Sequence, residues 1–377
     1  MNIPLLDLSE QNASLRSAVE AALGRVLDTN GFILGSEVAA LEGELAAYCG
    51  TKYAIGCASG SDAILLGLMA LDVRPGDEVI TTPYSFFATV SSITRLGAVP
   101  VFVDIDPSTY NLDTGQVESK ITGRTTAIEP VHLYGQCADM AAINEIATRH
   151  NIEVIEDAAQ AIGSELGGVR AGAMGALGCF SFYPSKNLGG MGDGGLLTTD
   201  DDALAKKLFA LRVHGTEERY YHKYVGLNSR LDGFQGAILR VKLPYLDEWT
   251  EKRRKNAEAY QTLFADAALL EFLTPPLEIE GGRHIYNQFV VRVPGHRDAL
   301  KKHLTDRGVG TDIYYPVPLH LQECFAYLGG QQGDLPEAEK AACETLALPI
   351  FPELRSAQIE YVVEMISEFF RSPGRID

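Results

Sequence analysis

The sequence of 377 residues contains few of the patterns that define disulfide-rich or metal-binding proteins. Its six cysteines form no Cys-x-x-Cys pair and no zinc-ligand spacing, so we expect reduced thiols in a cytoplasmic protein. Asp104 and Asp106 lie close together, but no histidine or further carboxylate stands at a spacing usable for a metal ion. We therefore expect no metal site.

Long apolar segments are absent as well. No run approaches the roughly 20 apolar residues that a membrane-spanning helix needs. The opening residues MNIPLLDLSE lack the basic start and the apolar core of an export signal. We therefore expect a protein that is neither exported nor embedded in a membrane.

Positive charge is scarce, since 32 lysines and arginines stand against 50 acidic residues and give a formal net charge of −18. Such an acidic surface repels nucleic acids and anionic membranes, and no basic stripe or helix-turn-helix pattern is present. Internal repeats and low-complexity tracts are also missing. What the chain does have is 46% hydrophobic residues, enough to bury a large core.

Short β-rich runs alternate with longer segments of helical period between Ala54 and Thr199. This alternation predicts an α/β domain with a mainly parallel sheet. In such sheets ligands bind beyond the carboxyl ends of the strands, so the residues that follow each run are the candidates for a site. The predicted strands are 79–82, 101–104, 127–131, 153–156, 179–182 and 196–199.

The pattern changes near Pro244, where a charged segment of helical period predicts a long connecting helix. We expect a large domain at 1–245, including an N-terminal arm, and a small domain at 246–377. The predicted features of the small domain are a strand at 288–293, a proline-rich loop at 314–320 and a terminal helix at 356–370.

A lysine lies between an apolar run and a glycine-dense loop in the segment FYPSKNLGGMGDGG. Desolvation would lower the pKa of Lys186, and an unprotonated lysine can form a Schiff base with an aldehyde. Taken alone, the segment also fits a surface lysine in a turn. The spacing of Gly190, Gly192 and Gly195 matches the dinucleotide fingerprint, but it leads into a strand rather than a helix, so we expect no nicotinamide or flavin site.

Asp157 ends the buried-looking run IEVIED. A carboxylate at that place can pair with the pyridine nitrogen of pyridoxal 5′-phosphate (PLP) and keep it protonated, so that the ring accepts electrons. Gln160 follows within one helical turn and could reach the phenolic oxygen of the ring. Taken alone, Asp157 could equally cap the following helix.

Two further segments have ligand-binding potential. The small-residue turn GCASGSDA opens an amphipathic helix, and its amides with the hydroxyls of Ser59 and Ser61 could hold a phosphate. An ordinary helix cap is the alternative. In TPYSFFAT an aromatic ring could lie flat against a cofactor, although adjacent phenylalanines are more often core residues.

In this order and spacing, these segments resemble the DegT-type family of nucleotide-sugar aminotransferases. The resemblance covers nearly the whole chain and implies the fold type I PLP-dependent transferase architecture. That architecture combines a large α/β/α domain, built on a mainly parallel sheet, with a smaller C-terminal α+β domain. The other motifs that support the resemblance are IPLLDL, GFILGSEV, GDEVITTP, VDIDP, LYGQ and GLNSRLD.

The resemblance implies roles for the residues around the cofactor ring. Lys186 would bind PLP as a Schiff base and move a proton between the donor and the cofactor, while Asp157 would pair with the pyridine nitrogen. Gln160 would contact the phenolic oxygen. Phe86 would stack on the ring, and Phe87 would replace it if the register differs by one residue.

The resemblance also implies contacts with phosphate and substrate. Gly60, Ser61 and Ser181 would contact the phosphate of the cofactor. Asn228 would reach the phosphate of the neighbouring subunit, which implies a homodimer with shared active sites. Residues of the second-domain loop would approach the sugar nucleotide, namely Tyr314 and His320.

The implied activity is amino transfer from L-glutamate to a keto-hexose carried by a nucleotide diphosphate, for amino-sugar biosynthesis. Glutamate would leave as 2-oxoglutarate, with pyridoxamine 5′-phosphate (PMP) as the aminated cofactor. Lys186 argues against the related sugar dehydratases, which have a histidine at this position. The motifs resemble relatives that aminate C3 of the hexose more than those that aminate C4 of a 4-keto-6-deoxy sugar. A non-catalytic sugar-nucleotide-binding or regulatory protein is the alternative from another class.

Overall fold

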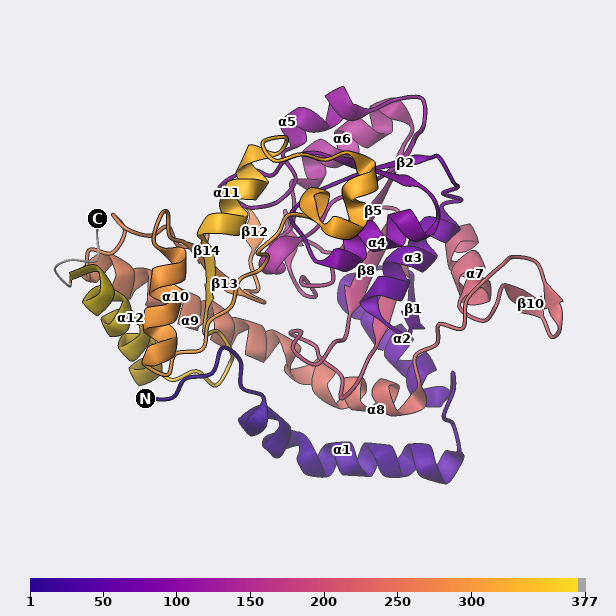
Figure 1. Cartoon of the computed structure of the whole chain (residues 1–377). Helices are drawn as coiled ribbons and strands as arrows, with labels where there is room; N and C mark the ends of the chain where they lie inside the picture. Colours follow the sequence, from indigo (N-terminus) through magenta and orange to yellow (C-terminus); the bar gives the residue numbers. More distant parts are fainter. Residues whose placement is uncertain (372–377) are drawn as a thin grey trace.

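A seven-stranded sheet forms the centre of the protein in the computed structural model, which describes residues 1–371 (Figure 1). The strand order is β1-β9-β8-β5-β4-β2-β3, and only β9 runs against its neighbours. The fold prediction of a mainly parallel sheet is therefore confirmed. The strands are β1 (Tyr53–Cys57), β2 (Glu78–Thr81), β3 (Val99–Phe102), β4 (Thr125–Glu129), β5 (Glu153–Asp157), β8 (Leu177–Ser181) and β9 (Gly195–Thr199).

Six of these strands lie within two residues of the predicted runs, and β1 was not among the predicted strands. Alternate side chains of each strand enter different apolar clusters, as a sheet buried on both faces requires. In β5, for example, Ile155 packs against the helix that follows β1, whereas Val154 packs against the opposite layer.

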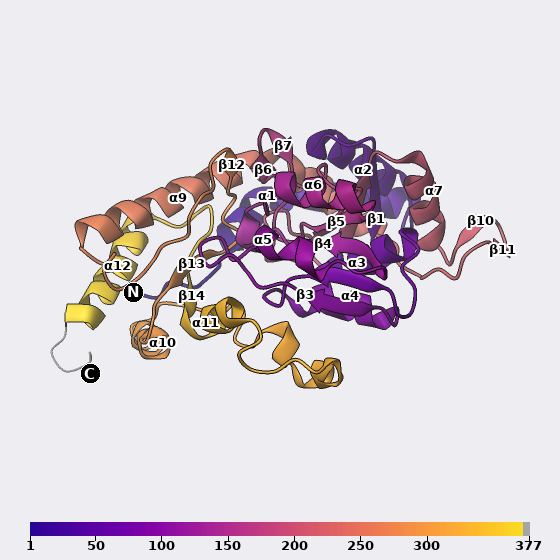
Figure 2. The same cartoon turned by 90° about the horizontal axis from the view of Figure 1, so that it is seen from above.

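Helices cover both faces of the sheet (Figure 2). One layer contains α3 (Gly60–Ala70), α4 (Phe87–Arg95) and α7 (Asp202–Leu211), which share an apolar cluster with the sheet. The other layer contains α2 (Ser36–Cys49), α6 (Met140–His150) and α8 (Gly233–Lys242). The helix α1 (Ser9–Thr29) lies outside these layers along α8, and a short helix, α5 (Thr114–Val117), precedes β4.

A second apolar core gathers around the C-terminal part of the chain, with Tyr260, Phe264 and Phe289 at its centre. Ile3 also enters this core, and its backbone pairs with Val309. The predicted strand and terminal helix of this part are present. The elements are α9 (Leu246–Asp266), β13 (Phe289–Arg292), α10 (Arg297–Asp306), α11 (Pro336–Glu344), β14 (Thr345–Leu348) and α12 (Ser356–Arg371).

The helix α9 bridges the two cores. Its Trp249 packs beside Leu15 of α1, whereas its Phe264 lies in the C-terminal core. The domain boundary at residue 245, which stays a prediction, would fall at the start of this bridging helix.

Small strands complete the fold. The hairpin of β10 (Thr216–Glu218) and β11 (Tyr221–His222) projects from the body of the protein in Figures 1 and 2. A three-stranded sheet consists of β6 (Glu165–Leu166), β7 (Val169–Arg170) and β12 (Gly282–Arg283). Within residues 1–371, no helix combines the length and the apolar character needed to cross a bilayer.

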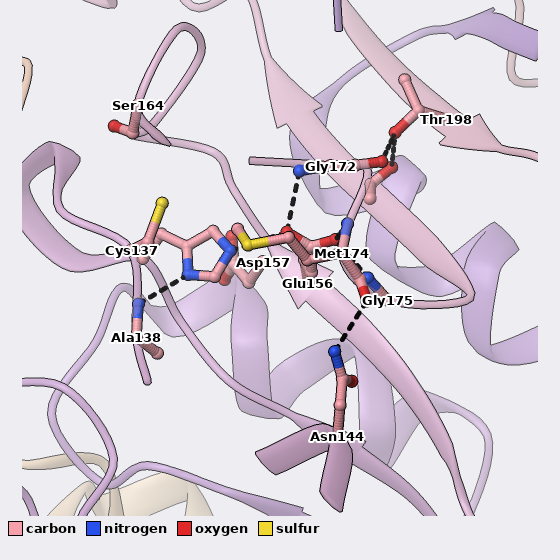
Figure 3. Close-up of polar contacts among 12 residues, drawn as sticks. Cys137, Ala138, Asn144, Glu156, Asp157, Ser164, Gly172, Met174, Gly175 and Thr198 are labelled. Atoms are coloured by element: carbon pink, nitrogen blue, oxygen red, sulfur yellow. Dashed lines mark hydrogen bonds and ion pairs between the residues drawn. The ribbon is translucent and has the colours of Figure 1, made fainter. Parts of the chain in front are cut away.

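A buried carboxylate, Glu156, ties a loop to the middle of the sheet (Figure 3). Its oxygens accept hydrogen bonds from His132 Nε2 at 2.8 Å and from the backbone amides of a nearby loop at 2.6–2.8 Å. Because the carboxylate is fully hydrogen-bonded, it can be buried on the face of β5 opposite to that of Asp157. The amides belong to Gly172, Met174 and Gly175.

Replacing Gly178 of β8 with alanine should destabilise the fold by about 1–3 kcal/mol. An added Cβ would lie 2.3 Å from the Gly172 Cα, and this backbone atom cannot rotate away. Urea denaturation of both proteins measures the change in the free energy of unfolding. Gly24→Ala in α1 is the matched control, because its Cβ would meet no atom within 4 Å and alanine favours a helix. Equal stabilities for the two variants would contradict the close approach.

Candidate active site

The candidate site lies where β5 and β8 end and where α3 begins. Asp157 is the last residue of β5, Ser181 is the last residue of β8, and Gly60 opens α3 directly after β1. The loop that carries Lys186 leaves β8 at the same edge of the sheet. These residues come together because parallel strands place their carboxyl ends side by side, as the sequence analysis assumed.

Lys186 lies in a tight turn between β8 and β9. Its backbone amide donates to the Tyr183 carbonyl at 2.9 Å, and the base of the loop closes through a bond of 2.8 Å from the Phe182 amide to the Gly194 carbonyl. No helix follows the loop's glycines before β9, as expected for a segment that does not bind a dinucleotide.

The charge of Lys186 is disfavoured at this place. Surrounding protein withdraws its ammonium group from water and lowers the pKa of Lys186 to about 8, although the negative charge of Asp157 acts in the opposite direction. A lysine with such a pKa is partly unprotonated near neutral pH and can act as a nucleophile.

Asp157 is 4% exposed and is held by two donors. The Thr89 hydroxyl on α4 donates to Oδ2 at 2.8 Å, and the Ala159 amide donates to Oδ1 at 3.2 Å. Burial raises the pKa of Asp157, while these hydrogen bonds and the charge of Lys186 act to lower it. A cation that approaches Asp157 would therefore meet a poorly solvated carboxylate and bind it strongly.

Gln160 is fixed by hydrogen bonds on both sides of its amide. The Tyr134 amide donates to Oε1 at 2.8 Å, and Nε2 donates to the Tyr315 hydroxyl at 3.0 Å. Tyr314 is the residue of this loop that was predicted to approach the substrate. Its main-chain carbonyl accepts a hydrogen bond of 2.8 Å from the Tyr84 hydroxyl. The neighbouring Tyr315 therefore links the proline-rich loop to the site.

The two adjacent phenylalanines have different surroundings. Phe86 is 56% exposed, and its ring centroid lies 6.2 Å from that of Tyr315. Phe87 stacks on Phe325 at 5.2 Å with an angle of 15° between the ring planes. Since one face of Phe87 is already covered, Phe86 is the better candidate to cover a ligand ring.

The start of α3 forms a narrow cradle. A Cβ at Gly60 would lie 2.7 Å from the Ser181 Cβ, so only glycine lets the helix approach β8 this closely. Ser59 caps the helix by accepting a hydrogen bond of 3.1 Å from the Asp62 amide, whereas Ser61 is exposed. The free amides and the dipole at this helix start suit a phosphate group.

Two further predicted residues have different surroundings. Asn228 is exposed and pairs through its backbone with Val213. His320 is buried, and its Nε2 lies 3.1 Å from a carboxylate oxygen of Glu339. A direct contact of His320 with a substrate stays a prediction, and its ring faces the interior in this structure.

Sequence reasoning missed several side chains that support the site. Thr89 and Tyr315 stand within or beside segments already singled out, but nothing in the sequence distinguished them from their neighbours. Lys242 of α8 is 2% exposed, and its Nζ donates to the Gly189 carbonyl of the Lys186 loop at 2.8 Å. The one signal in the sequence that could have indicated this contact is the unusual position of a lysine on an otherwise apolar face of the helix.

Comparison with known proteins gives consistent results. The model of the DegT/DnrJ/EryC1/StrS aminotransferase family matches residues 14–367. A UDP-N-acetyl-3-dehydro-α-D-glucosamine 3-aminotransferase from Acidithiobacillus ferrooxidans is 44% identical, over 97% of this chain and 97% of its own length. A protein named pleiotropic regulatory protein, from Geobacillus stearothermophilus, is 53% identical over 98% of this chain and 99% of its own length.

Solved structures agree with the sequence relatives. DesV from S. venezuelae, solved in complex with a ketimine intermediate, matches with a TM-score of 0.95 and 41% identity, over 98% of this chain and 99% of its own. NtdA from Bacillus subtilis, solved with bound PMP, matches with a TM-score of 0.89 and 33% identity, over 97% and 85%. The chain therefore belongs to the DegT/DnrJ/EryC1/StrS family of PLP-dependent sugar-nucleotide aminotransferases.

Proposed function

We propose that this protein transfers an amino group from L-glutamate to C3 of a keto-hexose carried by a nucleotide diphosphate. The observation that carries the proposal is that Lys186, whose pKa is lowered, lies within the electrostatic influence of the buried carboxylate of Asp157, beside a helix start suited to a phosphate. PLP, when bound, supplies a reactive carbonyl carbon and an electron-accepting ring. The remaining tasks fall to residues of the chain.

The residues present fit this cofactor. Asp157 is suited to hold a proton on the ring nitrogen, because its carboxylate is buried and lacks a full set of donors. Gln160 can offer its remaining amide hydrogen to the phenolic oxygen, and Phe86 presents a free ring face. Gly60 and Ser181, with the start of α3, form a cradle where any Cβ at position 60 would collide.

Lys186 is the residue of this group that can move a proton. In its neutral form it can take the proton from the α-carbon of the amino-acid donor and later return a proton on the acceptor side. Its turn is anchored at Gly189 by Lys242 and at the loop base by Phe182. Such anchoring favours transfer because the distance between donor and acceptor atoms stays fixed.

The position of the keto group is proposed from the relatives. Three of them, at 44%, 43% and 42% identity, have names that place an oxo or amino group at position 3 of the sugar. A GDP-perosamine synthase is 38% identical, so amination at C4 is the second candidate. The relative named as a regulatory protein supports a non-catalytic alternative, but retention of Lys186 with Asp157 favours turnover.

We also propose a homodimer in which Asn228 of the partner subunit contacts the phosphate. Large apolar side chains are exposed on the loops around the site and on the projecting hairpin. Exposure of such side chains to water is unfavourable, and a second subunit that covers them would remove this cost. The exposed position of Asn228 is compatible with a role in a neighbouring subunit. These exposed apolar residues include Phe32, Ile33, Phe86, Tyr183, Met191, Tyr220, Tyr221 and Val225.

The first experiment is a half-reaction without acceptor. Protein loaded with PLP should convert L-glutamate to 2-oxoglutarate once per site, with the visible absorption of PLP shifting to the near-ultraviolet absorption of PMP. Lys186→Ala should abolish the conversion while still binding PMP. Lys207→Ala is the control, because Lys207 bonds to the Ala70 carbonyl and to Asp72 outside the site. Full activity of Lys186→Ala would refute the assignment.

The second experiment compares acceptors. The PMP form should react with a 3-keto sugar nucleotide at least about tenfold faster than with a 4-keto-6-deoxy sugar nucleotide, which corresponds to about 1.4 kcal/mol of transition-state stabilisation. Product analysis by NMR locates the new amine. A faster reaction with the 4-keto substrate would establish the C4 alternative, and a lack of reaction with either would favour the regulatory one.

Because Lys242 is buried, the free energy of unfolding should change with pH in the alkaline range. Burial lowers its pKa from 10.5 to about 8, so the fold loses stability as pH falls from 10.5 to 8 and the loss is constant below. Relative to Lys242→Met, the wild type should lose on the order of 3 kcal/mol across this range. Urea denaturation at several pH values measures the difference. Lys207→Met is the matched control, and an equal slope in both variants would contradict the role of burial.

A further inference from the structure

Glu129, the last residue of β4, is a buried carboxyl group without a hydrogen-bond partner. It is 0% exposed, and neither of its carboxylate oxygens has a partner among the described residues. An ionised carboxylate in such a place is costly, because neither water nor a protein donor solvates it. Neither the fold nor the proposed roles above account for this side chain.

Its place in the sheet brings it next to Asp157. The strands β4 and β5 are parallel, Ala127 pairs with Glu153, and Val131 pairs with Asp157 in the same register. Because side chains alternate between the faces of a strand, Glu129 points to the same face as Asp157. Burial, with the negative charge of Asp157, raises the pKa of Glu129 well above its usual value.

The two carboxyl groups differ in how well their surroundings stabilise a negative charge. Asp157 accepts hydrogen bonds from the Thr89 hydroxyl and the Ala159 amide and is attracted by Lys186. Glu129 has none of these. A single negative charge is therefore stabilised on Asp157, and a proton on Glu129.

Other titratable groups near the pair favour the same distribution of charge. His132 also lowers the pKa of Asp157, and burial raises the pKa of Tyr315, so that its hydroxyl stays neutral. The Cys179 thiol on β8 pairs in register with Asp157 and stays protonated, since burial and both carboxyl groups raise its pKa. On β2, the Thr81 hydroxyl donates to the main-chain carbonyl of Glu129 at 2.8 Å and does not titrate. Helix α4 contributes the hydroxyl of Thr89, which is also neutral.

We propose that Glu129 is a positioning residue that acts through Asp157, carries the proton of this carboxyl pair, and couples binding of the protonated cofactor ring to release of that proton. This inference rests on the proposed function. Burial is the larger cause that keeps Glu129 protonated, and the charge of Asp157 is the smaller one. When the cationic ring binds, it neutralises the charge of Asp157 and removes this smaller cause, which lowers the pKa of Glu129. The O–H bond of Glu129 then breaks more readily and the proton passes to solvent, so that binding becomes tighter as pH rises.

The test measures the affinity of PMP, which forms no covalent bond with Lys186, by calorimetry between pH 6 and pH 9. The ratio of the Kd of Glu129→Gln to that of the wild type should rise with pH, about tenfold for each unit by which binding lowers the pKa of Glu129. In buffers of different ionisation enthalpy, the wild type should release more protons than the variant. Effects of Lys186 and of the PMP ring are present in both proteins and cancel in the ratio.

Glu78→Gln is the matched control. Glu78 starts β2 in the same sheet and is also buried, but it accepts a hydrogen bond of 2.5 Å from the Thr122 hydroxyl and pairs with Arg124. Its variant should bind PMP with the pH dependence of the wild type. A ratio for Glu129→Gln that stays constant with pH would overturn the inference, whereas failure of the wild type to bind PMP would refute the proposed function instead.

A second measurement uses the protein without cofactor. Because the pKa of Glu129 is raised in the fold, the wild type should lose stability relative to Glu129→Gln as pH increases above about 4.5. Thermal unfolding at several pH values measures the difference, and Glu129→Leu replaces Glu129→Gln if the latter does not fold. A difference in stability that does not change with pH would also overturn the inference.

Discussion

The attraction between Lys186 and Asp157 acts in a place where both groups are withdrawn from water. Each charge lowers the cost of withdrawing the other from water. The surrounding elements preserve this balance, with Thr89 directing a hydroxyl to the carboxylate and Lys242 holding the loop of the lysine.

The sheet provides the rigidity on which that balance depends. Glycine is required at Gly60 and Gly178, where a Cβ would collide with neighbouring residues. The close approach at Gly60 brings helix α3 against the end of strand β8, from which the loop of Lys186 leaves, whereas the one at Gly178 packs β8 against the loop of Gly172. The start of α3, the buried carboxylate of Asp157 and the loop of Lys186 thereby meet at one edge of a rigid sheet, so little conformational entropy would be lost when a ligand is bound there.

Much of this arrangement could be predicted, because strand periodicity and the ends of the strands are local properties. Asp157 and Lys186 both follow apolar runs, and the topology of a parallel sheet then brings them to one edge. What could not be predicted depends on contacts between distant segments. Gln160 contacts Tyr315, which nothing in the sequence singled out, and Glu129 faces Asp157 only through the register of two strands. The contact of the buried His320 with Glu339 of α11 is likewise a tertiary contact that no local pattern indicated.

The pairing of Ile3 with Val309 has a consequence for biosynthesis. A ribosome delivers Ile3 long before it delivers the strand partner and the aromatic residues of the same core. The first residues must therefore remain without this partner while the seven-stranded sheet can already assemble. The C-terminal core closes only after nearly all of the chain has been synthesised, which makes its formation the late, non-local step of folding.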